Sequence, residues 1–351
     1  MRKSKMALLL GGGAPNCTLM SGTLLAFHEA GVKFDVFSAG GAGGAMALMY
    51  LAPKGMSRED MMRNTVNMSI SDLIYKVLPI NYKMFLKGTP VAYAYRSLLS
   101  KLPFYDKIVN QYGMSKAEVF LSDLVQLVWS ATTPTTTNFF SKGMCANAPV
   151  LEQFIDFSKL QTVEEEVYLN AYCVDTQEIA IIGKEQIDMK SVGASFSYPF
   201  YYPPTKYGEK YYMEGGAVDA YNFEGLVEHD RDIRTVVVLD AFGDSKYIQT
   251  PRNLWQAYCQ SMVLPLVQLC EKDLQLLRYR VKERNEKKGK TAWELLAIEY
   301  NVPASWLPNS LDWSRTNMER MFELGYETGL KHVRRVGRDL GRTLFEIEDE
   351  D

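Results

Sequence analysis

Short apolar runs and apolar helical patterns alternate along the first fifty residues of the chain. Met6–Leu10 is a continuous apolar run that stops at Gly11, and a helical pattern follows over residues 19–30. Residues 32–38 predict a second strand, and a second apolar helical pattern begins after Gly44. Continuous apolar strands joined by helices are typical of a parallel sheet that is covered on both faces. The pattern therefore predicts the α/β class.

Strand and helix patterns continue in the second half of the chain. Residues 167–174 and 178–182 are apolar runs separated by a short polar turn, which predicts a hairpin. Residues 235–239 predict a further β-branched strand. Residues 254–281 predict one long helix or a pair, and residues 314–337 predict a last helix.

Residues 57–130 combine helical patterns with many aromatic and methionine side chains. Two interpretations are open for this segment, a cap over a pocket or an ordinary helical layer that packs on the core. Its part at about 70–105 is a candidate for contact with a protein partner or a membrane surface, provided that its apolar side chains are exposed.

The length and composition fit one large globular domain. The chain has 351 residues, 47% of them apolar, and no low-complexity linker divides it. We expect a single domain over 1–351, with a core at about 6–245 and a helical extension at about 250–345.

Charge and cysteine usage indicate where the protein works. The 39 basic and 42 acidic residues give a net charge of −3, so nucleic acid is not an expected partner. Five cysteines without C-x-x-C spacing indicate reduced thiols and a cytoplasmic location. No apolar stretch reaches the roughly 18 residues of a membrane-spanning helix, so membrane contact would be peripheral. The three histidines lack the spacing of metal ligands, and neither a metal nor a cofactor is expected.

Two glycine-rich turns follow the first two predicted strands. Gly11-Gly12-Gly13 leaves its amides unobstructed, as a loop that binds a phosphate or an oxyanion requires. The second turn, Ser38–Ala45, has the small residues of a nucleophile elbow, in which a serine lies on a sharp strand-to-helix turn. Position 41, where the hydroxyl is expected, is glycine. Because neighbouring parallel strands end at one edge of a sheet, we expect both turns to face one pocket.

Two later motifs complete a pattern that resembles a known family. They are the loop that runs from Ala194-Ser195 through Pro199 to Pro203-Pro204, and the acidic sequence Glu214-Gly215-Gly216. In this order, the four motifs resemble those of the patatin-like phospholipases, a family of lipid acyl hydrolases. The resemblance implies a three-layer α/β fold with a mainly parallel central sheet flanked by helices and with extra C-terminal helices.

The resemblance also implies a set of site residues. Patatin-like enzymes hydrolyse esters with a serine and aspartate dyad, and a glycine triplet supplies their oxyanion hole. On this chain the serine position falls on Gly41, the aspartate position on Glu214, and the oxyanion glycines on Gly11, Gly12 and Gly13. The dyad is therefore degenerate.

A degenerate dyad predicts a changed function. Glycine cannot form an acyl-enzyme, and loss of the nucleophile in another hydrolase lowers turnover by roughly 10⁶-fold. We expect a protein without hydrolase activity that keeps an acyl-lipid or acyl-thioester binding pocket or acts as a scaffold for a protein partner. The alternative is an active lipid acyl hydrolase, either with Cys17 or Ser38 as a substitute nucleophile or with Glu214 activating water. For Cys17 and Ser38, a buried structural role is the plainer interpretation.

Glu214 has two structural interpretations of its own. Its carboxylate could be partly exposed at the mouth of the pocket, or it could cap the amides of the turn at Gly40–Gly43. The second is preferred, because a carboxylate beside the elbow would fill the space left by the missing hydroxyl.

Overall fold

The computed structural model of the chain describes residues 5–229, 232–243, 245–287, 292–306 and 311–338. Its strands are β1 (Lys5–Leu10), β2 (Val36–Ala39), β3 (Glu166–Cys173), β4 (Glu178–Gly183), β5 (Thr205–Tyr207), β6 (Lys210–Glu214), β7 (Ile233–Asp240) and β8 (Glu294–Glu299). Its α-helices are α1 (Cys17–Glu29), α2 (Ala42–Leu51), α3 (Arg58–Asn64), α4 (Asp72–Val77), α5 (Pro90–Leu99), α6 (Tyr105–Asn110), α7 (Lys116–Thr132), α8 (Phe157–Leu160), α9 (Met189–Ser195), α10 (Leu254–Glu286) and α11 (Arg315–Arg338).

The described strands form one eight-stranded sheet. Its order is β5-β6-β3-β2-β1-β7-β8, with β4 paired to β3. β1 pairs in parallel with both β2 and β7, and its residues Met6 to Leu10 are buried, as a central parallel strand requires. β3 and β4 form the predicted antiparallel hairpin. The predicted α/β class and mainly parallel sheet are therefore confirmed.

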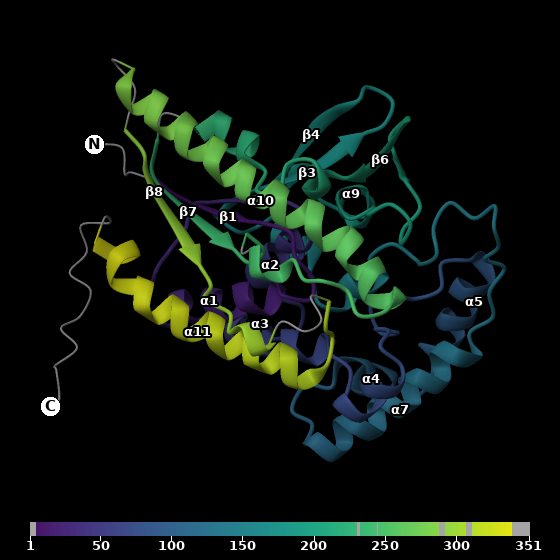
Figure 1. Cartoon of the computed structure of the whole chain (residues 1–351). Helices are drawn as coiled ribbons and strands as arrows, with labels where there is room; N and C mark the ends of the chain where they lie inside the picture. The colour runs from purple at the N-terminus through teal and green to yellow at the C-terminus, as the bar shows by residue number, and fades with distance from the viewer. Residues whose placement is uncertain (1–4, 230–231, 244, 288–291, 307–310, 339–351) are drawn as a thin grey trace, which may run out of the picture.

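Helices flank the sheet on both sides. In Figure 1, strands β8, β7 and β1 lie between the long helix α10 and the pair formed by α1 and α11. The backbones of α1 and α11 approach closely at glycines. A Cβ added to Gly22 would lie 2.7 Å from the Tyr326 nitrogen, and one added to Gly325 would lie 2.7 Å from the carbonyl carbon of Leu19. The C-terminal helix is thus an integral part of the fold.

The C-terminal part of the chain differs from the sequence prediction in one respect. Residues 250–345 were expected to be helical, but β8 pairs in parallel with β7 and adds a strand to the sheet. Leu296 and Ile298 of β8 are buried, while Leu295, Ala297 and Glu299, which alternate with them, are more exposed, as the two-residue period of a strand requires. Residues 254–281 belong to a single helix, α10, and not to a pair.

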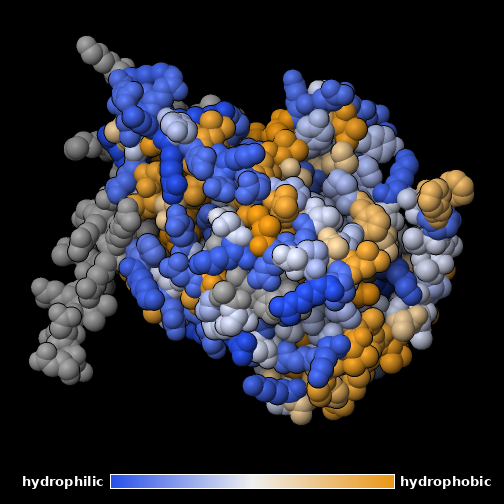
Figure 2. Space-filling model, viewed as in Figure 1, coloured by the Kyte–Doolittle hydropathy of each residue, from blue (hydrophilic) through white to orange (hydrophobic). Residues whose placement is uncertain are grey.

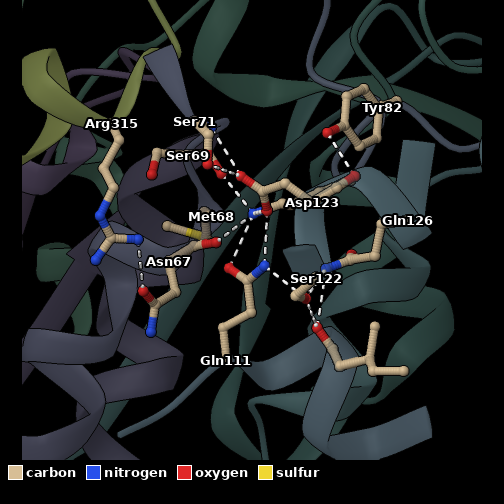
Figure 3. Close-up of polar contacts among 12 residues, drawn as sticks. Asn67, Met68, Ser69, Ser71, Tyr82, Gln111, Ser122, Asp123, Gln126 and Arg315 are labelled. Carbon is tan, nitrogen blue, oxygen red and sulfur yellow. Dashed lines mark hydrogen bonds and ion pairs between the residues drawn. The ribbon is translucent and has the colours of Figure 1, made fainter. Parts of the chain in front are cut away.

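A buried ion pair ties together the helical segment at 57–130. Lys83 Nζ lies 2.5 Å from Asp123 Oδ1, and both side chains are almost fully buried. The Asp123 carboxylate also accepts hydrogen bonds from the amide and hydroxyl of Ser71, at 2.7 and 2.6 Å, and from Gln111 Nε2, at 2.6 Å (Figure 3). Because every charge in this network has a partner, the network can hold the loops of the segment in one arrangement.

The same segment contributes both to the core and to the surroundings of the elbow. Ile74, Tyr75 and Tyr82 belong to the buried core, as one of the two interpretations predicted. Phe85 stacks on Tyr201, with ring centroids 4.9 Å apart. The segment is therefore partly a core layer and partly a neighbour of the loop at 196–204.

Candidate functional site

The turn between β2 and α2 has the backbone of a nucleophile elbow. β2 ends at Ala39 and α2 begins at Ala42, so Gly40 and Gly41 make the turn. Gly41 has φ 49° and ψ −131°, a conformation that residues with a side chain rarely adopt. A sharp, strained turn of this kind is what projects the nucleophile of an elbow into the site. Here the turn is present and the side chain is missing.

Close main-chain packing between three glycine segments holds the elbow in place. A Cβ added to Gly43 would lie 2.5 Å from the carbonyl oxygen of Gly11. A Cβ added to Gly40 would lie 2.8 Å from the carbonyl oxygen of Ala220 and 3.1 Å from Gly216 Cα. Any side chain at positions 40 or 43 would push these segments apart. The structure thus brings together the triplet, the elbow and the Glu214-Gly215-Gly216 sequence.

The Glu214 side chain lies directly beside Gly41. A Cβ added to Gly41 would collide with Glu214 Oε1, and it would lie 3.2 Å from the carboxyl carbon and 3.7 Å from Gly12 Cα. A side chain at position 41 would therefore project between Glu214 and the glycine triplet. The expected capping of the Gly40–Gly43 amides is wrong, because the amides of Gly40 and Gly43 donate to the carbonyl oxygens of Leu10 and Gly40, and the Glu214 carboxyl accepts no hydrogen bond from a described residue. Instead, the carboxyl approaches the Cα of Gly41.

Glu214 is half-buried and has no compensating charge beside it. Burial raises the pKa of its carboxyl to about 8, and no cation of the described chain lies close enough to lower it. At pH 7 the carboxyl therefore carries its proton. A protonated carboxyl can donate a hydrogen bond to a ligand, whereas it cannot remove a proton as a general base.

The three glycines of the triplet have different surroundings. An added Cβ would lie 2.8 Å from the Tyr221 ring at Gly11 and 2.9 Å from the Phe242 ring at Gly13, but it would meet nothing within 4 Å at Gly12. Within the part of the chain that the structure describes, the amides of Gly12 and Gly13 donate to no protein acceptor. These two amides are available to an oxygen atom of a ligand.

Cys17 and Ser38, the two candidate substitute nucleophiles, are both buried. The Cys17 thiol lies 3.5 Å from the carbonyl oxygen of Pro15, and burial raises its pKa to about 12, which disfavours the reactive thiolate. Ser38 lies within β2, has no exposed surface, and donates its hydroxyl to the carbonyl oxygen of Asn222 at 2.5 Å. These placements favour a structural role for both residues.

Tyrosines from the loop at 196–204 lie close to Glu214. The amide of Glu214 donates to the carbonyl oxygen of Ser197 at 3.1 Å. The pKa of Tyr198 is raised mainly by burial and further by the nearby Glu214 carboxyl. Phe200 of the same loop contacts Tyr258 of α10, with ring centroids 5.8 Å apart. The sequence analysis recognised this loop, but it missed Tyr258 because a lone tyrosine on a helix gives no sign of its neighbours.

The described residues hold neither a cluster of metal-ligating side chains nor a membrane-spanning helix. They contain no group of three or more His, Cys, Asp or Glu side chains that could hold a metal ion. No helix among them combines the length and the apolar character needed to cross a bilayer. All five cysteines are free and buried.

Solved structures that are similar to this chain include bacterial and human proteins. VipD from Legionella pneumophila is 14% identical, with a TM-score of 0.40, and the match covers 95% of this chain and 67% of VipD. Human GIVD cytosolic phospholipase A2, solved with methyl γ-linolenyl fluorophosphonate, is 11% identical, with a TM-score of 0.43 and coverage of 98% of this chain and 59% of that protein. The type III effector ExoU is 11% identical, with a TM-score of 0.33 and coverage of 95% and 53%. The present chain thus spans only part of the length of these proteins.

Sequence comparison assigns the family. No curated protein matches the sequence. The family model described as patatin-like phospholipase matches residues 8–227, which include the triplet, the elbow and Glu214. Since this match covers more than half of the chain, the protein belongs to the patatin-like phospholipase family.

Proposed function

We propose that this protein is a catalytically inactive patatin-like phospholipase whose elbow site binds an acyl lipid or an acyl thioester. The observation that carries the proposal is Gly41, which has the backbone of an elbow but no atom that could attack a carbonyl. Without a nucleophile, the covalent route of the family cannot proceed, and a loss of roughly 10⁶-fold in turnover is the expected scale.

The groups around Gly41 support binding of an acyl carbonyl. The unpaired amides of Gly12 and Gly13 would act as the oxyanion hole, with Gly11 packed behind them, and would donate to the carbonyl oxygen. The protonated Glu214 carboxyl supplies a further donor next to the same space. The rings of Tyr198 and Tyr202, whose pKa values are raised mainly by burial and further by the nearby Glu214 carboxyl, would offer apolar surface to an acyl chain.

A role in positioning a partner, in the cytoplasm or at a membrane surface, belongs to the same proposal. Three side chains of the 70–105 segment, Leu73, Val77 and Leu98, are 70%, 85% and 63% exposed. Exposed apolar side chains at this density are typical of surfaces that contact other molecules.

The proposal is tested with a fluorophosphonate probe and chromogenic esters of several chain lengths. The native protein should show neither labelling nor turnover above background, while mass spectrometry of the purified protein should detect a co-purified acyl ligand. Labelling of the native protein at any serine would contradict the proposal.

Gly41→Ser with and without Glu214→Asp makes the test more specific. A serine side chain at position 41 would collide with Glu214, and shortening the acid by one methylene relieves that contact. We therefore expect the double variant to react with the probe faster than Gly41→Ser alone. Gly183→Ser provides a control, because a side chain there makes only ordinary contact with Tyr168.

The alternative function is an active hydrolase in which Glu214 removes a proton from water. The unpaired Gly12 and Gly13 amides favour it, since they could stabilise an oxyanion. Because the pKa of Glu214 is about 8, such activity should appear above about pH 8 and be lost in Glu214→Gln. Activity lost instead in Cys17→Ala or Ser38→Ala would indicate a substitute nucleophile.

A further inference from the structure

The acidic residues of the chain are unevenly distributed. Six stretches of twenty or more residues contain no aspartate or glutamate: 1–28, 36–58, 73–105, 124–151, 189–208 and 245–270. The last four make up nearly a third of the 351 residues. All 42 acidic residues lie outside these four stretches.

The four stretches contact one another in the fold. The amide of Ala146 donates to the carbonyl oxygen of Leu86 at 2.6 Å, which joins the second stretch to the first. The amide of Cys145 donates to the carbonyl oxygen of Tyr201 at 2.7 Å, which joins the second to the third. Phe200 and Tyr258, with ring centroids 5.8 Å apart, join the third to the fourth. We call the connected surface of these four stretches the acid-free face.

Most of the exposed large hydrophobic side chains of the described chain lie on the acid-free face. They are Leu73, Val77, Ile80, Val91, Tyr93, Leu98, Leu102, Phe104, Leu124, Val125, Val128, Phe139, Phe140, Met144, Phe200, Leu254, Trp255 and Leu264. The most exposed are Phe139 at 96%, Phe140 at 90% and Leu254 at 87%. Figure 2 shows hydrophobic residues gathered where α4 and α7 lie in Figure 1. Apolar surface this extensive is unusual on a protein that meets only water.

The acid-free face carries exposed cations outside any ion pair among the described residues. Lys76, Lys101, Lys142 and Arg252 are exposed, and none of them forms an ion pair with another described residue. Arg252 lies two residues before the exposed pair Leu254 and Trp255. Lys142 lies two residues after the exposed pair Phe139 and Phe140. Cations thus lie beside the most exposed apolar side chains.

The acid-free face is continuous with the elbow site. Its third stretch contains the loop at 196–204, and Ser197 of that loop accepts a hydrogen bond from the Glu214 amide. Phe85 of the first stretch stacks on Tyr201 of the same loop. Any surface that covers the acid-free face therefore lies next to the site proposed for the acyl ligand.

We propose that the acid-free face docks the protein onto an anionic lipid bilayer, with Phe139, Phe140, Leu254 and Trp255 inserted into the interface. Lys142 and Arg252 then contact the lipid phosphates. This inference rests on the proposed function, because the docked bilayer would supply the acyl lipid that the elbow site is proposed to bind. It extends the contact expected from residues 70–105 to three further stretches.

The combination of charge and apolar surface favours a bilayer over a protein partner. Interfacial protein segments combine inserted aromatic and leucine side chains with lysine and arginine that attract anionic headgroups. The cores of protein interfaces, by contrast, are depleted of lysine, and a protein partner would need an acidic surface of matching size.

Vesicle co-sedimentation tests the inference with the full chain. The native protein should bind phosphatidylcholine vesicles that contain phosphatidylglycerol, and it should bind pure phosphatidylcholine vesicles much less. Phe139→Ser with Phe140→Ser should weaken binding by about tenfold or more, because two large apolar side chains are removed from the interface. Lys142→Glu with Arg252→Glu should weaken binding at low salt and have little effect at high salt.

Matched variants outside the acid-free face serve as controls. Tyr279→Ser and Leu330→Ser remove exposed apolar side chains, and Lys33→Glu with Lys272→Glu reverses two exposed charges, so vesicle binding should stay unchanged. Equal binding to both kinds of vesicle, no vesicle binding, an equal loss in the controls, or self-association through Phe139 and Phe140 in light scattering would overturn the inference.

Binding of a monomeric acyl thioester without vesicles separates this inference from the proposed function. The variants of the acid-free face should still bind the acyl thioester but should no longer bind anionic vesicles. A native protein that binds anionic vesicles but no acyl ligand would refute the proposed function and leave the docking surface standing.

Discussion

Two acidic side chains, the fully buried Asp123 and the half-buried Glu214, have opposite surroundings. Asp123 on α7 is fully buried, and its carboxylate has an ion pair with Lys83 and hydrogen bonds from Ser71 and Gln111. Glu214 has only burial acting on it, so its pKa is raised to about 8. Its carboxyl has no hydrogen-bond donor or cation among the described residues.

This difference separates a structural carboxylate from one that is available to a ligand. A buried polar group that lacks a partner costs free energy, so proteins keep few of them. The cost at Glu214 falls beside the free amides of Gly12 and Gly13, where a ligand carbonyl could accept the proton of the acid. Asp123 has no such capacity left, since its partners already use its oxygens.

The largest expected effect on stability comes from breaking the ion pair between Lys83 and Asp123. Lys83→Met removes the cation next to Asp123 and leaves a buried carboxylate without its counter-ion. We expect the free energy of unfolding to fall by about 3–5 kcal/mol, measured by urea denaturation at pH 7.

Two further variants test that value. Arg63→Met breaks the surface pair with Glu29, whose side chains are 54% and 32% exposed, and it should cost at most about 1 kcal/mol. Lys83→Met combined with Asp123→Leu should recover part of the loss, because no uncompensated charge remains. If Lys83→Met lowered the free energy of unfolding no more than Arg63→Met, the contrast between the Asp123 and Glu214 carboxyls would not hold.

An intermediate effect is expected from Glu214→Gln, and it depends on pH. The folded-state pKa of about 8 exceeds the ordinary value of 4.5, so between these values the folded protein holds a proton that the unfolded chain has released. Native stability should therefore fall, relative to the variant, as the pH rises from about 5 to 8, and the difference should be constant beyond both limits. Allowing for the partial exposure of the side chain, we expect a change of roughly 2 kcal/mol.

Urea denaturation of both proteins across this pH range measures the difference. Glu209→Gln is a suitable control, since that exposed side chain lies on the turn between β5 and β6 and only pairs with Lys206 at the surface. Parallel stability curves for the native protein and Glu214→Gln would show that Glu214 is ionised at neutral pH and would remove its proposed donor role.

The central strands could be predicted from the sequence because their signal is local. Met6–Leu10 is a continuous apolar run bounded by glycine, and a strand buried on both faces requires such a run. β8 could not be predicted in the same way, because Glu294–Glu299 is short and its apolar residues also fit a helical turn. Its strand conformation depends on β7, which offers an edge for pairing.

The site shows the same division between local and distant information. The elbow and the triplet are visible in the sequence as small residues at strand ends, whereas the contact of Glu214 with Gly41 joins positions far apart and was placed by family resemblance. The capping geometry was wrong because it depends on the path of the side chain after β6. The burial of Asp123 was not predicted, because nothing in the local sequence distinguishes it from an exposed acid on an amphipathic helix.

The smallest expected effect comes from Ser38, a buried polar group near the elbow that already has a partner. Ser38→Ala removes the hydroxyl that donates to the carbonyl oxygen of Asn222, so we expect a loss of about 1 kcal/mol in the free energy of unfolding. Ser195→Ala is the matched control, because that buried hydroxyl donates to the carbonyl oxygen of Asn170 at 2.7 Å. In the Gly41→Ser, Glu214→Asp protein, neither change should alter the rate of fluorophosphonate labelling. If Ser38→Ala lowered the labelling rate and Ser195→Ala did not, the Ser38 hydroxyl would take part in the reaction although it is hydrogen-bonded. A hydrogen-bond partner would then not distinguish a structural group from a reactive one at the elbow.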